Sequence, residues 1–273
     1  MIRLGFTEST LLFYYYLNKF NLIDNEAYKD CQNNLVNWLY STSGFYDKTV
    51  KGTYFDFDTE HNKNTCLYNK YFEKVLRNLK NVNCKIELNF HQMNEKVLPF
   101  KENFFKYINY YNKESKYSDI FSFMANKKVL IINNLSPLMK QQFESGNIHK
   151  ICPEFPENIK GIVSFENGYS FFNNGPHENI LQTYRSLKRK IQKLKFDCVI
   201  VSAGAYSSLL AYHISQKLNK DVFCYGGSLP DYFGIITKRT QLFNSNKINE
   251  YWVKVPEEMK PEGYMKIEDG CYW

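Results

Sequence analysis

The stretch that decides the fold is "VIVSAGAYSSLL", residues 199–210. It runs from β-branched apolar residues through small ones into residues suited to the first turn of a helix, and therefore predicts a buried strand, a tight turn and a helix. Ser202, Gly204, Tyr206 and Ser207 lie at the bend. Two interpretations are open: the bend holds a ligand, or it only lets strand and helix pack closely.

The same alternation of strand and helix extends through the second half of the chain. Apolar runs predict strands at 128–134, 161–165, 196–204 and 221–227, and amphipathic segments predict helices at 136–145, 178–195 and 206–220. Continuous apolar strands that alternate with helices are typical of a parallel sheet covered on both faces. The sequence therefore predicts an α/β fold with a Rossmann-like parallel sheet and helices on both faces.

The first half of the chain is richer in helix. Residues 1–5 and 84–90 predict strands, whereas 7–20, 25–41, 67–81 and the aromatic region from about 99 to 117 predict helices. No repeat, low-complexity segment or linker rich in proline and glycine separates the two halves. We expect one domain over 1–273, with a helix-rich N-terminal portion (1–125) and a Rossmann-like portion (126–273).

Composition narrows the class of protein. The 273 residues are 44% hydrophobic, enough for a large core, and the net charge of +7 favours anionic ligands. No dense block of lysine and arginine is present, so a nucleic-acid partner is not expected. Seven dispersed cysteines without a C-x-x-C pair indicate reduced thiols and a cytoplasmic location. Neither a signal-peptide pattern nor an apolar run as long as a membrane span occurs.

Two strand ends in the second half carry small and polar residues. Ligands of an open parallel sheet bind beyond the carboxyl ends of its strands, and the N–H groups that open the helix at Tyr206 favour a phosphate there. Lys238 and Arg239 follow the next strand end, "YGGSLPDYFG", at positions suited to neutralise a diphosphate. The bend lacks the dinucleotide fingerprint and the P-loop lysine, so close packing of small residues is the alternative.

A charged pair flanks a glycine at the first strand-to-helix junction. Arg3 and Glu8 lie on either side of Gly5 in "RLGFTE". If this strand joins the same sheet, Glu8 projects at the ligand edge, where it can act as a general base. The alternative is a first-turn glutamate that is favourable to the helix dipole.

Other candidate residues lie outside these turns. Asp56 and Asp58 form a D-x-D pattern in "YFDFDTE", whose oxygen ligands suit Mg²⁺ or Mn²⁺; alternatively, Thr59 or Asp58 caps the helical region that follows. His177 lies in the polar loop "NNGPHEN", from which it can contact a ligand. His213 has no visible partner and is expected to pack within a helix.

The motifs occur in an order that resembles a known family. The family's motifs R-x-G-x-x-E, G-[YF]-[YF], N-P-H and G-A-Y-G correspond to "RLGFTE" (3–8), "GFY" (44–46), "NGPH" (174–177) and "GAYS" (204–207), followed by a donor loop from 226 to 239 and a terminal "IEDGCYW" (267–273). On these residues the chain resembles the glycosyltransferases of the GT-D fold. The resemblance is greatest to a group from bacteria and large DNA viruses that includes viral xylosyltransferase-like proteins.

The resemblance implies transfer of a sugar from a nucleotide-diphosphate donor, with UDP as the expected nucleotide, to a hydroxyl of a glycan or glycoprotein acceptor. For this reaction we expect Glu8 to be the base that activates the acceptor hydroxyl, with Arg3 orienting it or balancing its charge. Some GT-D enzymes use a divalent metal, Mn²⁺ or Mg²⁺, and no other organic cofactor is expected. The residues expected to bind the donor are Gly5, Ser202, Gly204, Ala205, Tyr206, Tyr225, Gly226, Gly227, Ser228, Phe233, Gly234, Lys238 and Arg239.

Four positions depart from the family's pattern. Pro230 replaces a polar residue, Thr237 a glycine, Thr240 a tryptophan, and Ser207 a frequent glycine. Because these changes cluster near the expected donor loop, the alternative function is a non-catalytic scaffold of the same fold that binds a nucleotide or glycan. Glu8 is kept, which favours the enzyme. A methyltransferase is a third, weaker alternative, since no acidic residue ends a neighbouring strand to hold a ribose.

Overall fold

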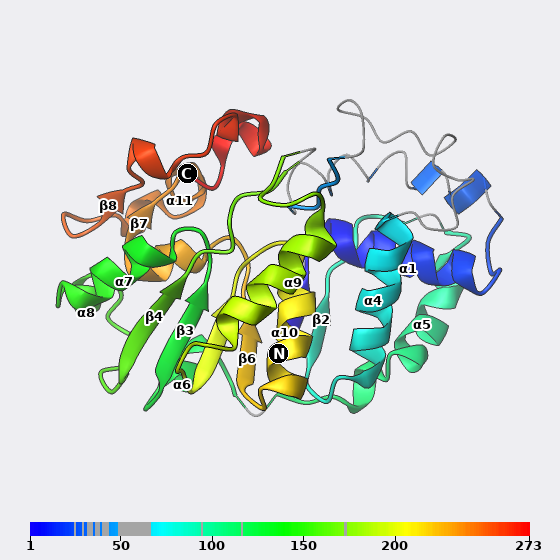
Figure 1. Cartoon of the computed structure of the whole chain (residues 1–273), viewed down its shortest axis with the longest axis horizontal. Coiled ribbons are helices and arrows are strands. Elements are labelled where there is room, and N and C mark those ends of the chain that lie inside the picture. Colours follow the sequence, from blue (N-terminus) through cyan, green and yellow to red (C-terminus); the bar gives the residue numbers. More distant parts are fainter. Residues whose placement is uncertain are drawn as a thin grey trace.

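The computed structural model describes residues 1–24, 26–28, 30–31, 35, 39, 44–48, 67–93, 95–115, 117–171 and 174–273. Its centre is a parallel four-stranded sheet in the order β4-β3-β5-β6 (Figure 1). The strands are β3 (Lys128–Ile132), β4 (Gly161–Phe165), β5 (Cys198–Val201) and β6 (Asp221–Cys224). The predicted α/β fold with a parallel sheet is confirmed at this level.

A second parallel pair continues the sheet beyond β6. It consists of β1 (Ile2–Leu4) and β2 (Ile86–Leu88). The backbone N–H of Cys224 donates to the carbonyl of Met1 at 3.0 Å, and the terminal amino group of Met1 donates to the carbonyl of Val222 at 2.6 Å. The start of the chain therefore lies beside β6. This meets the condition under which the sequence analysis placed Glu8 at the ligand edge, namely that the first strand joins the same sheet.

Both faces of the sheet are covered. Successive side chains of a strand point to opposite faces, so those of one strand enter two different buried clusters. In β3, Leu130 and Ile132 belong to one buried cluster, whereas Val129 and Ile131 belong to another. Strand β5 divides its residues in the same way, and all of its side chains are buried. This pattern explains why these strands read as continuous apolar runs.

Two groups of helices cover these faces. The first cluster includes side chains of α1 (Phe6–Lys19), α4 (Leu67–Asn81), α5 (Lys101–Tyr107), α9 (Ile180–Ile191) and α10 (Tyr206–Lys217). The second includes side chains of α6 (Ile120–Met124), α7 (Ser136–Glu144) and α8 (Ile148–Ile151). The first cluster contains residues of both the helix-rich and the Rossmann-like portion, so the two portions share a core.

The C-terminal region lies at the carboxyl ends of β3 and β4 (Figure 1, orange to red). It contains β7 (Ile235–Ile236), α11 (Lys238–Phe243) and β8 (Val253–Lys254). The backbone N–H groups of Lys238 and Arg239 donate to the carbonyls of Trp273 and Cys271, both at 2.9 Å. Short 3₁₀ helices occur at Leu98–Phe100, Tyr110–Asn112, Leu229–Phe233, Ser245–Lys247, Glu257–Met259, Tyr264–Lys266 and Glu268–Gly270.

Several predicted elements differ in extent. The region from 99 to 117 is not one helix: it is helical in pieces as far as Asn112, and Lys113, which follows, is extended. Asn109 has a positive φ of 55°, which interrupts the helix there. Most of the helix predicted at 25–41 lies outside the described residues. Throughout the described ranges, no helix has both the length and the apolar character needed to cross a membrane.

Candidate functional site

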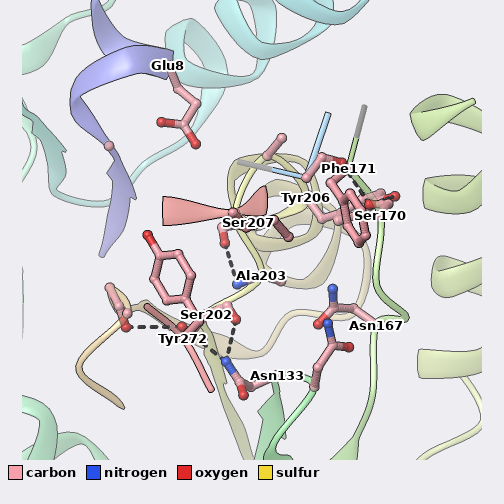
Figure 2. A pocket seen from close by; sticks show the side chains of 18 of the residues that line it. Glu8, Asn133, Asn167, Ser170, Phe171, Ser202, Ala203, Tyr206, Ser207 and Tyr272 are labelled. Carbon is pink, nitrogen blue, oxygen red and sulfur yellow. Dashed lines mark hydrogen bonds between the residues drawn. The ribbon is translucent and has the colours of Figure 1, made fainter. Parts of the chain in front are cut away.

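The candidate site is a cavity at the carboxyl ends of the strands. The chain passes from β3 to β4 on one side and from β5 to β6 on the other, so the winding direction reverses between β3 and β5. Loops that diverge at such a reversal leave a crevice for ligands. A cavity of about 460 Å³ lies there and is lined from β1, from the ends of β3, β5 and β6, and from the C-terminal segment (Figure 2).

The turn between β5 and α10 forms one wall and is held in place by a hydrogen bond within the turn and by another from Asn133, which follows β3. The Oγ of Ser207 accepts a hydrogen bond from the backbone N–H of Ala203 at 3.0 Å, and Nδ2 of Asn133 donates to the carbonyl of Ser202 at 2.8 Å (Figure 2). Gly204 has a φ of 50°, which favours glycine. The turn is thus rigid, with small residues facing the cavity.

The sequence analysis expected the backbone N–H groups that open the helix at Tyr206 to bind a phosphate, but two of them are already hydrogen-bonded. The N–H of Tyr206 donates to the carbonyl of Ala203 at 3.1 Å, and that of Ser207 to the carbonyl of Gly204 at 2.9 Å, so neither is free for a phosphate. No described group accepts a hydrogen bond from the N–H of Gly204 or Ala205, and both residues line the cavity. The anion-binding capacity of the turn lies at these two positions.

The junction between β1 and α1 forms the opposite wall. Glu8 lies in the first turn of α1, is only 9% exposed, and points its carboxylate toward the cavity (Figure 2). Gly5 immediately precedes this helix, and a Cβ there would lie 2.6 Å from Oε2 of Glu8. Glycine at this position therefore leaves room for the observed position of the carboxylate.

Arg3 lines the cavity from the middle of β1. Its Nε lies 3.4 Å from Oε1 of Glu87 on β2, and its Nη1 would lie 3.1 Å from a Cβ added to Gly226. The guanidinium thus lies beside the loop that follows β6, where glycine leaves room for it. The pair with Glu87 is more than a third exposed, so it contributes little to stability.

His91 is a lining residue that the sequence analysis missed. Its backbone N–H donates to Oγ1 of Thr10 at 2.9 Å, and its Nε2 lies 3.3 Å from Oγ1 of Thr7. The imidazole also packs on Phe6, with ring centroids 5.6 Å apart. Its position directly after the predicted strand at 84–90 was the available signal, because strand ends meet at one edge of a parallel sheet.

Three asparagines that the sequence analysis also missed follow β3 and β4 and line the cavity. Asn133 is fully engaged: Nδ2 donates to Ser202, and Oδ1 accepts from the N–H of Leu135 at 2.8 Å. Oδ1 of Asn134 and Oδ1 of Asn167 are buried and accept no hydrogen bond from the described residues. Asparagines after predicted strands were the signal, but sequence alone does not distinguish a partnered amide from an unpartnered one.

The expected donor loop after β6 reaches the cavity only in part. Of the residues expected to bind the donor, those that line the cavity are Gly5, Ser202, Gly204, Ala205, Tyr206, Tyr225, Gly226, Gly227 and Arg239. Four others are not among the lining residues. Ser228 precedes a 3₁₀ helix, Phe233 is buried in the second core, Gly234 packs against Ile151, and Nζ of Lys238 donates to the carbonyl of Asp269 at 2.8 Å.

Two of the departures from the family's pattern have a local structural role. Thr237 and Thr240 form a reciprocal capping box at the start of α11, with each side chain bonded to the backbone N–H of the other at 3.1 Å. Oγ1 of Thr240 also donates to Oδ1 of Asp231 at 2.7 Å. Both threonines lie outside the cavity lining, whereas Pro230 is part of it.

His177 lies outside the cavity lining. Its Nδ1 is 2.9 Å from Oγ1 of Thr183 on α9, and its backbone N–H donates to the hydroxyl of Tyr46 at 3.1 Å. The ring of Tyr46 lies against Gly175, where a Cβ would be only 2.3 Å from the ring. The "GFY" and "NGPH" motifs therefore pack on each other, and the position of His177 gives no support for ligand contact.

Two buried tyrosines also line the cavity, Tyr71 from α4 and Tyr206 from the start of α10. The hydroxyl of Tyr71 donates to the carbonyl of Ala205 at 2.9 Å, and that of Tyr206 is 3.0 Å from Oγ of Ser170. Burial, and then the nearby charge of Glu8, raise the pKa of Tyr71 well above its usual range. Burial also raises the pKa of Tyr206. Both hydroxyls stay neutral at physiological pH and are unsuited to act as the base.

The charged groups of the lining are Arg3 and Arg239 on the positive side and Glu8 and Glu268 on the negative side. The described part of the chain contains no group of three His, Cys, Asp or Glu residues placed to hold a metal ion. Asp56 and Asp58 lie outside the described residues. The described side chains therefore do not fit a protein-built metal cage.

Comparison with known proteins adds no assignment: no protein-family model, curated protein or solved structure matches the chain.

Proposed function

We propose that this protein is a glycosyltransferase of the GT-D type that transfers a sugar from a UDP-linked donor to a hydroxyl of a glycan or glycoprotein. The observation that carries the proposal is the pairing of two features in one cavity. The carboxylate of Glu8 faces the cavity (Figure 2). Gly204 and Ala205 also line it, and their backbone N–H groups donate to no described group. A base and an anion-binding turn are the groups that direct displacement of a nucleoside diphosphate by an acceptor hydroxyl uses.

In the proposed reaction, Glu8 accepts the proton of the acceptor hydroxyl. The acceptor oxygen then bonds to the anomeric carbon as the bond from that carbon to the diphosphate breaks, and the nucleoside diphosphate leaves with the electron pair. The N–H groups of Gly204 and Ala205 and the guanidinium of Arg239 stabilise the negative charge of the leaving group. Because the described side chains do not fit a metal cage, no step is assigned to a metal.

The test is turnover of Glu8→Gln, measured as nucleotide release from a panel of UDP- and GDP-sugars with and without Mn²⁺. We expect wild-type protein to release nucleotide and Glu8→Gln to be slowed at least about 100-fold, because a positioned base contributes that much. Binding of UDP should be preserved. Glu268→Gln is the matched control, since Glu268 is the other carboxylate in the lining. An undiminished rate in Glu8→Gln would end the assignment of the base.

The second candidate is a non-catalytic nucleotide-binding scaffold of the same fold. It is favoured by Lys238, whose ammonium is bonded to the C-terminal segment and not offered to the cavity, and by Pro230 in the lining. Thermal stabilisation by UDP-sugars without nucleotide release would identify the scaffold. Slow hydrolysis of the donor would identify the enzyme.

A further inference from the structure

The cavity has two chemically different ends. On the side of β1, the lining includes the charged side chains of Arg3 and Glu8. On the side of β3 and β4, it includes the neutral amides of Asn134 and Asn167 and the aromatic ring of Tyr169. The C-terminal region adds the charged side chains of Arg239 and Glu268 to the lining. A ligand that fills this cavity therefore meets neutral amides after β3 and β4 and charged groups beside β1 and the C-terminal region.

Asn167 is the clearest indication of what the neutral end binds. Its side chain extends from the segment after β4 into the cavity (Figure 2), and the residue is only 7% exposed. Nδ2 donates to the carbonyl of Gly168 at 3.2 Å, but Oδ1 is buried without a donor among the described residues. A buried acceptor without a partner destabilises the folded state. Other buried polar groups of the described residues also lack a partner, but Asn167 lines the cavity, where a ligand can supply the donor.

The neighbouring Asn133 shows that this is not a general property of the asparagines here. Both ends of its amide are bonded within the protein, to Ser202 and Leu135. Oδ1 of Asn134, in contrast, accepts no hydrogen bond from the part of the chain that the structure describes, like that of Asn167. The neutral end therefore presents two acceptor oxygens, which suit the N–H or O–H donors of a ligand and repel its phosphates.

An aromatic surface adjoins these amides. Tyr169 and Trp273 both line the cavity, with ring centroids 5.6 Å apart. Nε1 of Trp273 donates to the hydroxyl of Tyr169 at 3.2 Å, and that hydroxyl donates to the carbonyl of Met259 at 2.9 Å. These bonds hold the rings in place, and a flat ring of a ligand can pack against such a surface.

We propose that the end of the cavity formed after β3 and β4 is the nucleoside subsite, in which Oδ1 of Asn167 accepts a hydrogen bond from the base or ribose. This inference rests on the proposed function. It places the diphosphate at the turn before α10 and the transferred sugar beside Glu8, because these three parts of the cavity follow one another from β4 to β1. Asn167 is thus a specificity-determining residue.

The experiment compares UDP and inorganic pyrophosphate binding to wild-type protein and to Asn167→Leu by calorimetry. The substitution keeps the size of the side chain and removes the acceptor. We expect UDP to bind about tenfold more weakly, the value of one buried hydrogen bond, and pyrophosphate to bind unchanged. The melting temperature of the free protein should stay the same or rise, since an unpartnered buried oxygen is lost. Asn133→Leu is the matched control and should lower it.

Nucleoside analogues identify which group of the nucleoside donates the hydrogen bond to Oδ1 of Asn167. If the base supplies it, N3-methyl-UDP binds the wild type more weakly than UDP does, whereas 2′-deoxy- or 3′-deoxy-UDP loses affinity if a ribose hydroxyl supplies it. In either case, the difference disappears in Asn167→Leu. Unchanged UDP affinity in Asn167→Leu, equal weakening of UDP and pyrophosphate, or no loss with any analogue would overturn the inference and leave the glycosyltransferase proposal standing. Failure of wild-type protein to bind UDP would overturn both.

Discussion

The parallel strands of the central sheet all begin on one side, here called the amino edge, and all end on the other, the carboxyl edge. These two edges differ in how many of their polar groups have hydrogen-bond partners. At the amino edge, the hydroxyl of Tyr117 donates to Oδ2 of Asp221 at 2.6 Å and accepts from Nζ of Lys127 at 2.9 Å. Oδ2 of Asp197 accepts from the N–H of Lys128 at 2.8 Å. These polar groups are bonded within the fold and contribute to its stability.

At the carboxyl edge, several groups keep unused bonding capacity. The side-chain oxygens of Asn134 and Asn167 and the N–H groups of Gly204 and Ala205 have no partner among the described residues, and all four residues line the cavity. A polar group without a partner at a cavity can gain one from a bound ligand. The amino edge therefore uses its polar groups within the fold, whereas the carboxyl edge is the one at which we propose that a ligand binds.

The largest effect is expected for Gly5→Ala at the carboxyl edge. The new Cβ would lie 2.6 Å from Oε2 of Glu8, so the carboxylate must move. Misplacing a catalytic group by about 1 Å costs roughly 100-fold in rate, and we expect nucleotide release to fall by that factor. The backbone of Gly5 suits alanine, with φ −68° and ψ 176°, so the melting temperature should change little.

Gly226→Ala is the matched control for Gly5→Ala. Its Cβ would lie 3.1 Å from Nη1 of Arg3, a less severe contact with the end of a flexible side chain. We expect a smaller loss of turnover than with Gly5→Ala. Equal rates in Gly5→Ala and the wild type would contradict the role given to Glu8.

The sequence predicts much of the fold but only part of the site. The strands containing Leu130 and Val199 are buried on both faces and therefore appear as unbroken apolar runs. Polar residues after strands, such as His91 and Asn167, look like ordinary loop residues. Their importance depends on which strands are neighbours and on which hydrogen bonds are left unmade, and neither is a local property of the sequence.

The C-terminal loop shows the same limit. Lys238 and Arg239 are adjacent in sequence and equally suited to a diphosphate, yet only Arg239 lines the cavity. The difference arises because Lys238 bonds to Asp269, thirty-one positions along the chain. Thr237 and Thr240 likewise appear as losses from a donor motif, whereas in the fold they cap α11. Their departure from the family's pattern is therefore compatible with an intact site.

A pH-dependent loss of stability is expected from His213, which is outside the cavity lining. Burial, and then the charges of Lys188, Lys217 and Lys74, lower the pKa of His213 to about 4. Because the unfolded chain binds the proton more readily, stability is full above about pH 6.5 and falls as the pH drops toward 4. Between pH 7 and pH 5 this costs about 2 kcal/mol in the free energy of unfolding.

Urea unfolding at both pH values measures this effect, with His213→Gln as the comparison. The variant should lose less stability between pH 7 and pH 5 than the wild type does. Nucleotide release by the variant, measured at either pH, should match the wild type, because His213 is not a cavity residue. An identical pH dependence in both proteins would show that the protonation of His213 is not the cause.

At the amino edge, Tyr117→Phe should affect stability alone. The substitution removes the hydroxyl that joins Asp221 to Lys127. Hydrogen bonds to charged groups contribute about 1.5–3 kcal/mol, and partial exposure of this cluster places the expected loss near the lower limit. Urea unfolding should show that loss while UDP affinity stays constant. A change in UDP affinity would mean that the two edges are coupled and would break the comparison.

The smallest effect is expected for Tyr71→Phe, which tests a residue of the carboxyl edge that is fully partnered. Its hydroxyl donates to the carbonyl of Ala205 and so ties α4 to the turn before α10. Loss of one buried neutral hydrogen bond should cost about 1 kcal/mol in urea unfolding. Since the raised pKa keeps this hydroxyl protonated, the pH profile of nucleotide release should keep its shape. A shifted profile would instead show that Tyr71 influences the protonation of Glu8. Nucleotide release would then depend on groups of the carboxyl edge that have hydrogen-bond partners as much as on those that have none among the described residues.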